Sequence, residues 1–294
     1  MSTQFTFEAI GTHFWIEIFD EISNEVLLAT KSHLELLCSD FNEHYSRFRT
    51  DSQISILNRE RRLDNPSKEC QGLLSYGKGL YLRTHTTFNI LTGHILEARG
   101  YDANYSFTAI PSLASLKICN PLTDLTISDE AVTLSCGNLD IGGYGKGWLI
   151  DILAADLLSH GIKYFLVNGG GDMYATSDDE NPISIYLEHP TESGKYLIET
   201  TLHNQGFAAS SPFKRQWSDK GVTYTHIVSD KEVLSLGAFT KATTATDADA
   251  FVTACGLLSE AELLALSEQE DISFARFNPQ TNELWQTENF SLYN

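Results

Sequence analysis

Two oxygen-bearing side chains within residues 243–253 have the spacing of a metal half-site. Asp249 and Thr253 are four positions apart, so in a helix their oxygens share one face. Carboxylate and hydroxyl oxygens suit Mg²⁺, which keeps other coordination positions for water and phosphate. The spacing therefore indicates a magnesium half-site. A structural role stays open as well, in which Asp249 stabilises a first helical turn and Thr253 packs in the core.

A glycine-rich segment with one lysine, residues 139–151, has the composition of an anion-binding turn. A strand is predicted to end there and a helix to begin near Lys146, and the unpaired N–H groups of a helix start attract phosphate. The segment is not a Walker A loop, because Asp140 and Gly147 stand where that motif needs glycine and a hydroxyl residue. It also lacks the glycine spacing of a Rossmann dinucleotide fingerprint. Glycines that serve only the turn remain the alternative.

A histidine and an aromatic segment could complete such a site. His226 falls in a predicted strand, where it alternates with Thr225 and Ile227. Imidazole titrates near neutral pH and can act as a base, although a structural histidine is the alternative. Residues 45–58 mix aromatic, cationic and hydroxyl side chains. That mixture suits a stacked ring with a polar edge, and it equally suits an ordinary loop with a helix cap.

The elements that must position these residues follow from the hydrophobic pattern, which predicts an α+β fold of mixed sheets packed with helices. Strands are expected at residues 4–19, with Gly11 as a candidate bend, and at 162–167, 183–202 and 221–236. Helices are expected from residue 24, at 72–86 and 146–160, and as a pair at 246–269, with Ser259 and Glu262 as a capping box. Because the chain has no repeat and no long linker, we expect one compact domain over residues 1–294, with two closely packed lobes.

Composition excludes several classes of function. The 294 residues include 20 Lys plus Arg and 39 Asp plus Glu, a formal charge of −19 that repels nucleic acid and anionic lipid. With 42% hydrophobic and 11% aromatic residues, the chain can form a packed core. No stretch approaches the roughly 18 consecutive apolar residues of a membrane span.

The cysteines indicate the compartment. They are Cys38, Cys70, Cys119, Cys136 and Cys255, an odd number without a C-x-x-C pair. We therefore expect small buried hydrophobic side chains in a reducing compartment, and neither a zinc site nor a disulfide framework. The N-terminal residues lack a cationic signal-peptide region. A cytoplasmic location is expected for the chain as written, and a periplasmic one if a leader has been removed.

Taken in order, these segments resemble the motifs of the ApbE family of flavin transferases. The similar segments are residues 10–12, 46–58, 88–93, 144–151, 167–172, 210–215 with His226, and 248–253. The last of them contains the A-D-A-x-x-T metal motif of the family unchanged. The resemblance covers nearly the whole chain. It implies a T-fold-related α+β architecture with an active site between two lobes.

The resemblance also implies a reaction. Such enzymes bind FAD and Mg²⁺, cleave the pyrophosphate, transfer FMN through a phosphoester bond to a threonine of a target flavoprotein, and release AMP. By this resemblance Asp249, Thr253 and the carbonyl of Gly145 would hold the metal. Lys146 would lie at the phosphates and assist the transfer, and Asp151 would lie near the adenosine part.

The remaining FAD contacts come from two further parts of the chain. By resemblance, one group would line the adenine side and consists of Asn168, Gly169 and Gly170. Thr12 and Tyr45 would lie on the flavin side.

The acceptor side shows both a match and departures. His226 is implied as the base that activates the acceptor threonine. The family has an aspartate three positions after this histidine, whereas here Ser229 occupies that position and Asp230 follows. Asn89 and Leu91 also depart from the family's F-D-x-T-x-G segment.

Two other functions stay open at this point. Some relatives hydrolyse FAD to FMN and AMP with water as the acceptor, and a Mg²⁺-dependent FAD pyrophosphatase would carry the same motifs. The other alternative is a non-catalytic FAD-binding protein.

Overall fold

The computed structural model describes residues 2–177, 181–213 and 215–293, and these form two units. Unit 1 comprises residues 1–40, 143–211 and 234–294, and unit 2 comprises residues 41–142 and 212–233. The long helix α1 (Asn24–Tyr45) contributes residues to both. Lys214, which falls within one of the motif segments, lies outside the described residues.

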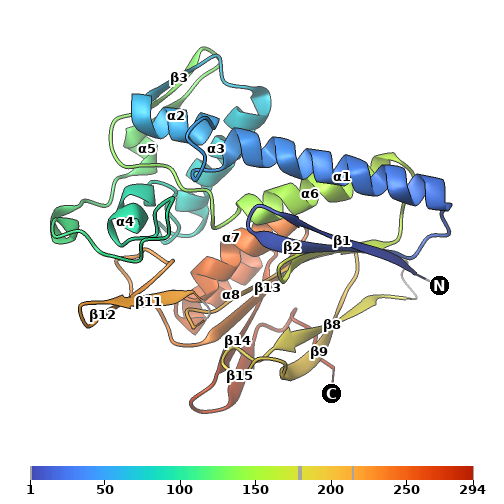
Figure 1. The fold of residues 1–294 in the computed structure, drawn as a ribbon. Helices are drawn as coiled ribbons and strands as arrows, with labels where there is room; N and C mark the ends of the chain where they lie inside the picture. The colour runs from blue at the N-terminus through green and yellow to red at the C-terminus, as the bar shows by residue number, and fades with distance from the viewer. Residues whose placement is uncertain (1, 178–180, 214, 294) are drawn as a thin grey trace. The chain divides into compact units, whose positions relative to one another are not determined.

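An eight-stranded antiparallel sheet forms the centre of unit 1 (Figure 1). In spatial order its strands are β1 (Thr3–Ala9), β2 (Thr12–Ile18), β6 (Phe165–Gly169), β7 (Asp172–Thr176), β10 (Gln205–Ser210), β13 (Gly237–Ala242), β14 (Ser273–Asn278) and β15 (Glu283–Gln286). Strands β1 and β2 pair up to Ala9 opposite Thr12, so the chain turns at Ile10 and Gly11. Both turn residues have positive φ, and the bend predicted at Gly11 is confirmed.

Different elements cover the two faces of this sheet, because side chains alternate along each strand. Helices α6 (Gly145–Ser159) and α7 (Ala245–Cys255) cover one face, and the hairpin of β8 (Ile183–Glu188) and β9 (Tyr196–Leu202) packs on the other (Figure 1). The Thr240 hydroxyl of β13 donates to the Ala248 carbonyl of α7 at 2.6 Å. Its neighbour Phe239 belongs instead to the apolar cluster beneath β8 and β9.

Two helices of unit 1, α7 and α8 (Glu260–Glu270), begin with a side-chain cap. The Thr244 side chain accepts from the Asp247 N–H at the start of α7. Helix α8 begins with the capping box of Ser259 and Glu262, and this prediction is confirmed. The helix predicted at residues 146–160 corresponds to α6 within one residue at each end.

Unit 2 consists of shorter elements. Its helices are α2 (Gln53–Glu60), α3 (Lys68–Arg83), α4 (Gly93–Ala98) and α5 (Pro121–Asp124), with a 3₁₀ turn at Leu113–Ser115. Its strands are β3 (Arg62–Asp64), β4 (Leu125–Ile127) and β5 (Ala131–Leu134), which form one sheet in the order β3-β5-β4, and β11 (Gln216–Asp219) and β12 (Val222–Thr225), which form a hairpin.

The strand predicted at residues 221–236 is wrong over most of its length. Strand β12 ends at Thr225, because its register with β11 runs only from Gln216 opposite Thr225 to Asp219 opposite Val222. His226 therefore lies beyond the strand. The prediction that it alternates within a strand is corrected accordingly.

The expectation of cysteines without a disulfide is wrong for one pair. Cys119 and Cys136 are joined by a disulfide, because the chain between them folds through α5, β4 and β5 and brings their Cα atoms to 5.8 Å. The other three, Cys38, Cys70 and Cys255, are free and buried, as predicted. Burial raises the pKa of the Cys38 thiol to about 12 and those of Cys70 and Cys255 to about 11, so these three stay protonated at neutral pH.

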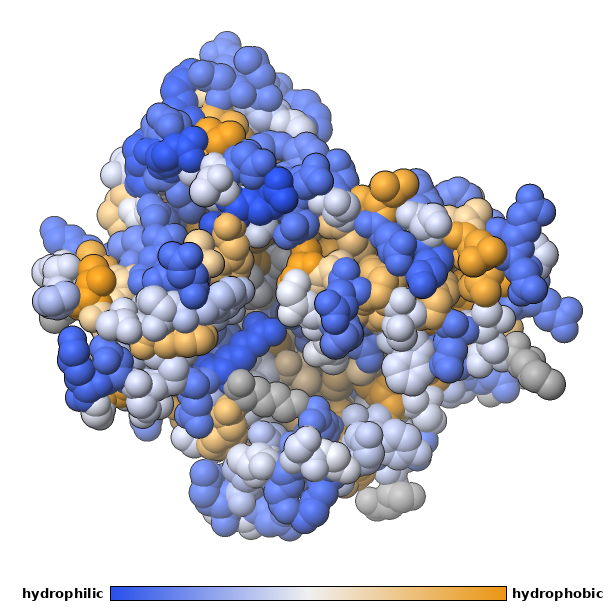
Figure 2. Space-filling view, in the orientation of Figure 1, coloured by the Kyte–Doolittle hydropathy of each residue, from blue (hydrophilic) through white to orange (hydrophobic). Residues whose placement is uncertain are grey.

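The predicted α+β class is confirmed. On the face seen in Figure 2 hydrophilic residues predominate, and the hydrophobic ones lie in small separate groups. None of the helices in the described part of the chain combines the length and the apolar character that a membrane crossing requires.

Candidate active site

Helix α6 begins within the glycine-rich segment, beside Lys146, as the sequence predicted. Gly145 is its first residue, and Tyr144 precedes it without a side-chain cap. A Cβ atom on Gly147 would lie 2.3 Å from the Ala245 carbonyl oxygen, so only glycine allows the first turn of α6 to touch the start of α7. From the other side, a Cβ on Gly206 of β10 would lie 2.2 Å from the Thr244 carbonyl oxygen. The start of α7 is thus held between two glycines.

A buried cluster of one amine and two carboxylates forms at this contact. The Lys146 amine bonds to Asp172 Oδ2 and, at 3.2 Å, to Asp249 Oδ1. The three side chains are 19%, 5% and 7% exposed, respectively. Asp249 Oδ2 accepts from the Gly147 N–H at 3.0 Å, so this helix-start amide, expected to be unpaired, has a carboxylate partner. Two carboxylates against one amine leave the cluster with a formal charge of −1.

Asp249 and Thr253 lie one helical turn apart in α7, as their spacing predicted. The acidic residue of the first turn is Asp247, which leaves Asp249 in the second turn. Asp249 is buried and Thr253 half-buried, and the Thr253 hydroxyl has no hydrogen-bond partner among the described residues. A carboxylate, a hydroxyl and the Gly145 carbonyl are all hard oxygen donors beside a negative cluster. This donor set fits Mg²⁺.

Asp172 is a member of the cluster that the sequence pattern did not single out. It is the first residue of β7, after the two-residue turn of Gly170 and Gly171, both of which have positive φ. The Asn168 carboxamide oxygen accepts from the Gly171 N–H at 2.8 Å and closes this turn. The signal was present in the sequence, since an acidic residue directly follows the glycines, but its facing helix could not be read there.

Asp151 has a defined structural partner. Its carboxylate accepts from the Ala245 N–H at 2.9 Å, and from the Thr246 N–H and hydroxyl at 2.9 and 2.5 Å. Burial raises the pKa of this carboxyl, and these hydrogen bonds counteract the rise. Asp151 thus anchors the N-terminus of α7 to α6, a different contact from the one expected with adenosine.

Three further predicted residues lie at adjacent hairpin turns. A Cβ on Gly170 would lie 2.2 Å from Thr12 Oγ1, so the Thr12 hydroxyl sits against this glycine. Gly169 packs closely on the Phe14 ring and on Ile150 of α6. Thr12, Gly169 and Gly170 therefore lie close together at the β1–β2 and β6–β7 turns, whereas the resemblance assigned Thr12 to the flavin side and the two glycines to the adenine side.

Tyr45 and His226 belong to unit 2. The buried Tyr45 hydroxyl lies 3.5 Å from Ser67 Oγ, and burial raises the pKa of this phenol. His226 Nδ1 lies 3.4 Å from the Arg215 carbonyl oxygen. Because a carbonyl only accepts, this contact is a hydrogen bond in the tautomer that carries its proton on Nδ1, and in that tautomer the basic lone pair of the neutral ring is on Nε2.

The segment of residues 46–58 has a structural role within unit 2. Ser52 caps α2, and Arg47 forms a buried ion pair with Asp140 at 2.5 Å. The Asn58 carboxamide donates to the Leu139 carbonyl at 3.0 Å and accepts from the Leu139 N–H at 2.7 Å. These contacts support the loop-and-cap interpretation.

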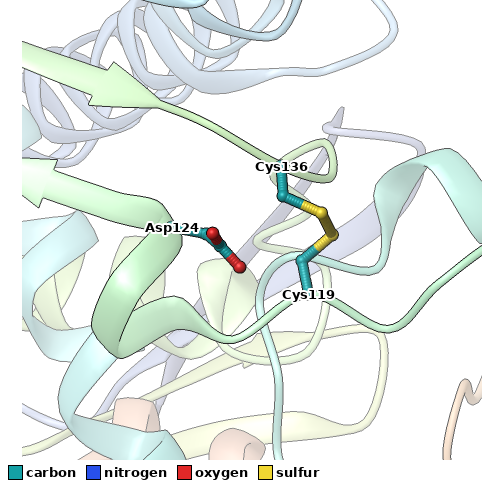
Figure 3. Close-up of side chains that lie close together, drawn as sticks. All are labelled: Cys119, Asp124 and Cys136. Atoms are coloured by element: carbon teal, nitrogen blue, oxygen red, sulfur yellow. A yellow bond between two sulfur atoms is a disulfide. The ribbon is translucent and has the colours of Figure 1, made fainter.

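A second group with metal-ligand chemistry lies in unit 2. Cys119, Asp124 and Cys136 place one ligand atom each within 4.8 Å of one another, and Figure 3 shows the Asp124 carboxylate directed towards the cysteines. The two sulfurs are bonded to each other. Asp124 accepts from the Asn120 N–H and the Ser135 hydroxyl, both at 2.8 Å. Because both sulfurs and the carboxylate already have partners, the group is structural and crosslinks the two ends of residues 119–136.

Comparison with known proteins gives one consistent family. The model of the ApbE family matches residues 10–275. A FAD:protein FMN transferase of Rhodobacter capsulatus is 30% identical in an alignment 163 positions long that covers 53% of this chain and 31% of that protein. One of Haemophilus influenzae is 22% identical in an alignment 289 positions long that covers 90% of this chain and 83% of that protein. The crystal structure of the ApbE protein of Thermotoga maritima has a TM-score of 0.86 at 19% identity and covers 98% of this chain and 97% of that one, which shows the same fold.

Proposed function

Because the chain belongs to the ApbE family, we propose that it is a Mg²⁺-dependent FAD:protein FMN transferase. The acceptor is a threonine hydroxyl of a target flavoprotein. Its oxygen bonds to the FMN phosphorus of FAD, the pyrophosphate bond to the AMP oxygen breaks, and AMP leaves. The names of the curated relatives support the transfer. The proposals of Mg²⁺ as the metal and of threonine as the acceptor are supported by the sequence motifs and by the donor set of the site.

The observation that carries the proposal is the buried cluster of Lys146, Asp172 and Asp249, with Thr253 one turn along α7. A buried cluster with a net negative charge is costly unless a cation joins it. Asp249, Thr253 and the Gly145 carbonyl would hold Mg²⁺, which supplies charge neutralisation at the pyrophosphate and at the departing AMP oxygen.

The chain's own residues supply the rest of the chemistry. Lys146 places a positive charge at the start of α6, where helix-start amides also attract phosphate oxygens. His226 Nε2 takes the proton of the acceptor hydroxyl, since its Nδ1 carries a proton held by the Arg215 carbonyl. The hydroxyl needs such a base because it is a weak nucleophile at neutral pH.

One incubation tests the reaction. The chain is mixed with FAD, Mg²⁺ and a flavoprotein that carries an acceptor threonine. We expect covalent flavin fluorescence on the acceptor in a denaturing gel, together with one AMP per flavin. AMP with free FMN would identify a pyrophosphatase instead, and bound, unchanged FAD would identify a non-catalytic binding protein.

The metal assignment is tested by a matched pair of substitutions in α7. We expect Asp249→Ala to lower the transfer rate at least about 100-fold and to abolish its dependence on Mg²⁺, because the charged metal ligand is lost. Asp247→Ala, two positions earlier in the same helix, is the control and should retain Mg²⁺-dependent transfer. Full Mg²⁺-dependent turnover by the Asp249 variant would show that Asp249 is not a metal ligand.

A further inference from the structure

We propose that Asp172 is a positioning residue that acts through Lys146. It holds the Lys146 amine so that the amine does not neutralise Asp249, and it thereby keeps Asp249 able to bind a divalent cation. This inference rests on the proposed function and adds a residue to which the family motif assigned no role.

The first support is the shared amine. Lys146 bonds to both carboxylates, so its single positive charge is divided between Asp172 and Asp249. Without Asp172, Asp249 would be its one carboxylate partner in the cluster. A neutral, hydrogen-bonded Lys–Asp pair has little attraction for a second cation, whereas the three-residue cluster retains a formal charge of −1.

The second support is the rigidity of Asp172. Its backbone is fixed at the first residue of β7, opposite Gly169 in the β6–β7 hairpin. Its Oδ1 accepts from the Ala209 N–H of β10 at 3.3 Å while Oδ2 bonds to Lys146. With the side chain 5% exposed, Asp172 has little freedom to follow the amine. Lys146, the most exposed member at 19%, has the greater freedom to shift towards Asp249 when Asp172 is lost.

The third support comes from the other side of Asp249. Its Oδ2 is already fixed by the Gly147 N–H at 3.0 Å, so Oδ1 is the oxygen for which the Lys146 amine and a cation compete. The half-buried carboxylate of Asp151 is engaged by the N-terminus of α7 and does not compete for the amine. Asp172 is thus the residue in the cluster that determines how strongly the Lys146 amine pairs with Asp249 Oδ1.

A double-mutant cycle on metal binding tests this inference. The probe is Mn²⁺ alone, without FAD, and the free ion is measured by its electron paramagnetic resonance signal. Asp172→Asn keeps the size and the acceptor for Ala209 but removes the charge, and Lys146→Met removes the amine. We expect Asp172→Asn to weaken Mn²⁺ binding about tenfold or more in the wild-type background, but at most about threefold in the Lys146→Met background. Asp172→Glu should restore most of the affinity.

Each outcome decides the matter. An unchanged Mn²⁺ affinity in Asp172→Asn, or an equal loss in both backgrounds, overturns the role of Asp172 and leaves the proposed function intact. If the unsubstituted protein binds no Mn²⁺, the proposed metal site fails and this inference falls with it. Thermal unfolding in EDTA checks that each variant folds, and Asp172→Ser replaces Asp172→Asn in the cycle if the latter does not.

Discussion

Two lysines of unit 1 lie in opposite electrostatic environments. Lys146 is paired with two carboxylates in the cluster at the start of α6. Lys241 of β13 is 4% exposed and, among the described residues, has only the Ser291 carbonyl, at 3.3 Å, and the Phe290 ring as polar or cation–π partners. Burial lowers the pKa of Lys241 from 10.5 to about 8. One lysine thus contributes charge to a site, while the other carries a charge that the fold tolerates at a cost.

The cost at Lys241 predicts a pH dependence of stability. Between pH 8 and 10.5 the unfolded chain binds more protons at this residue than the folded chain, so the free energy of unfolding should rise with pH in that window. Lys241→Met should remove this rise and increase the free energy of unfolding at pH 7 by about 1–3 kcal/mol. Urea unfolding at pH 7, 8, 9 and 10 measures both effects.

The control for this prediction is Lys68→Met, since the Lys68 side chain is 79% exposed. It should leave the pH profile unchanged. The Ser291 carbonyl keeps the Thr200 hydroxyl as a donor at 2.5 Å, so the methionine leaves no buried acceptor without a partner. A lower stability of Lys241→Met at pH 7 would contradict the prediction.

His226 gives a second prediction at this scale. We expect His226→Ala to bind FAD with unchanged affinity and to transfer FMN about 10²–10⁴ times more slowly, because only the base for the acceptor is lost. Single-turnover transfer and FAD titration separate the two quantities. His160→Ala, a 60% exposed histidine at the end of α6, serves as the control. Wild-type rates in the His226 variant would show that this histidine is structural.

At the scale of elements, regularities within a segment were predictable and contacts between segments were not. The four-residue spacing of Asp249 and Thr253 and the capping box at Ser259 depend only on local sequence, and both hold. Asp172 and Asp151 act on residues 26 and 94 positions away along the chain, respectively. Such contacts follow from which strands and helices pack together, and that packing cannot be read from local patterns in a single sequence.

The disulfide of unit 2 was missed for the same reason. Its cysteines are 17 positions apart without a recognisable spacing, and α5, β4 and β5 bring them together. The early end of β12 is a similar case, because the length of its partner β11 limits it. The sequence around His226 favours a strand, but β11 offers no pairing partner beyond Thr225, so the strand ends before His226.

Cys119 and Cys136 provide the prediction for this scale. The closed loop of 17 positions predicts that reduction, or the double substitution Cys119→Ser/Cys136→Ser, lowers the free energy of unfolding by about 3 kcal/mol. Alkylation of the denatured protein should modify three cysteines before reduction and five after it. Five modified cysteines before reduction, or equal stability of the oxidised and reduced forms, would refute it.

At the scale of the whole molecule, the charge of −19 and an anionic substrate must be reconciled. The acidic surface repels FAD, and the cluster at α6 is itself negative before a cation joins it. In the proposed function, attraction therefore comes from a small region, where a divalent cation, Lys146 and helix-start amides would act at short range.

This argument predicts that FAD binding depends on the metal. Chelation with EDTA should weaken FAD binding at least about 100-fold, since the pyrophosphate then meets a net negative cluster. Fluorescence titration of FAD with and without EDTA measures the effect, and restoration by excess Mg²⁺ is the control. Tight FAD binding without metal would mean that Lys146 and the amides suffice.

The two glycines that hold the start of α7 also fix where each later residue of that helix lies. Gly147 and Gly206 fix Ala245 in place. Asp249 and Thr253 follow it in the same helix by four and eight residues, so their positions depend on that spacing. Each helical residue advances the direction of a side chain by about 100°. One residue inserted between Ala245 and Asp249 would therefore turn the Asp249 carboxylate away from Lys146, and Thr253 with it, while leaving every residue type unchanged. In this segment the length of the chain is as strict a requirement as its chemistry.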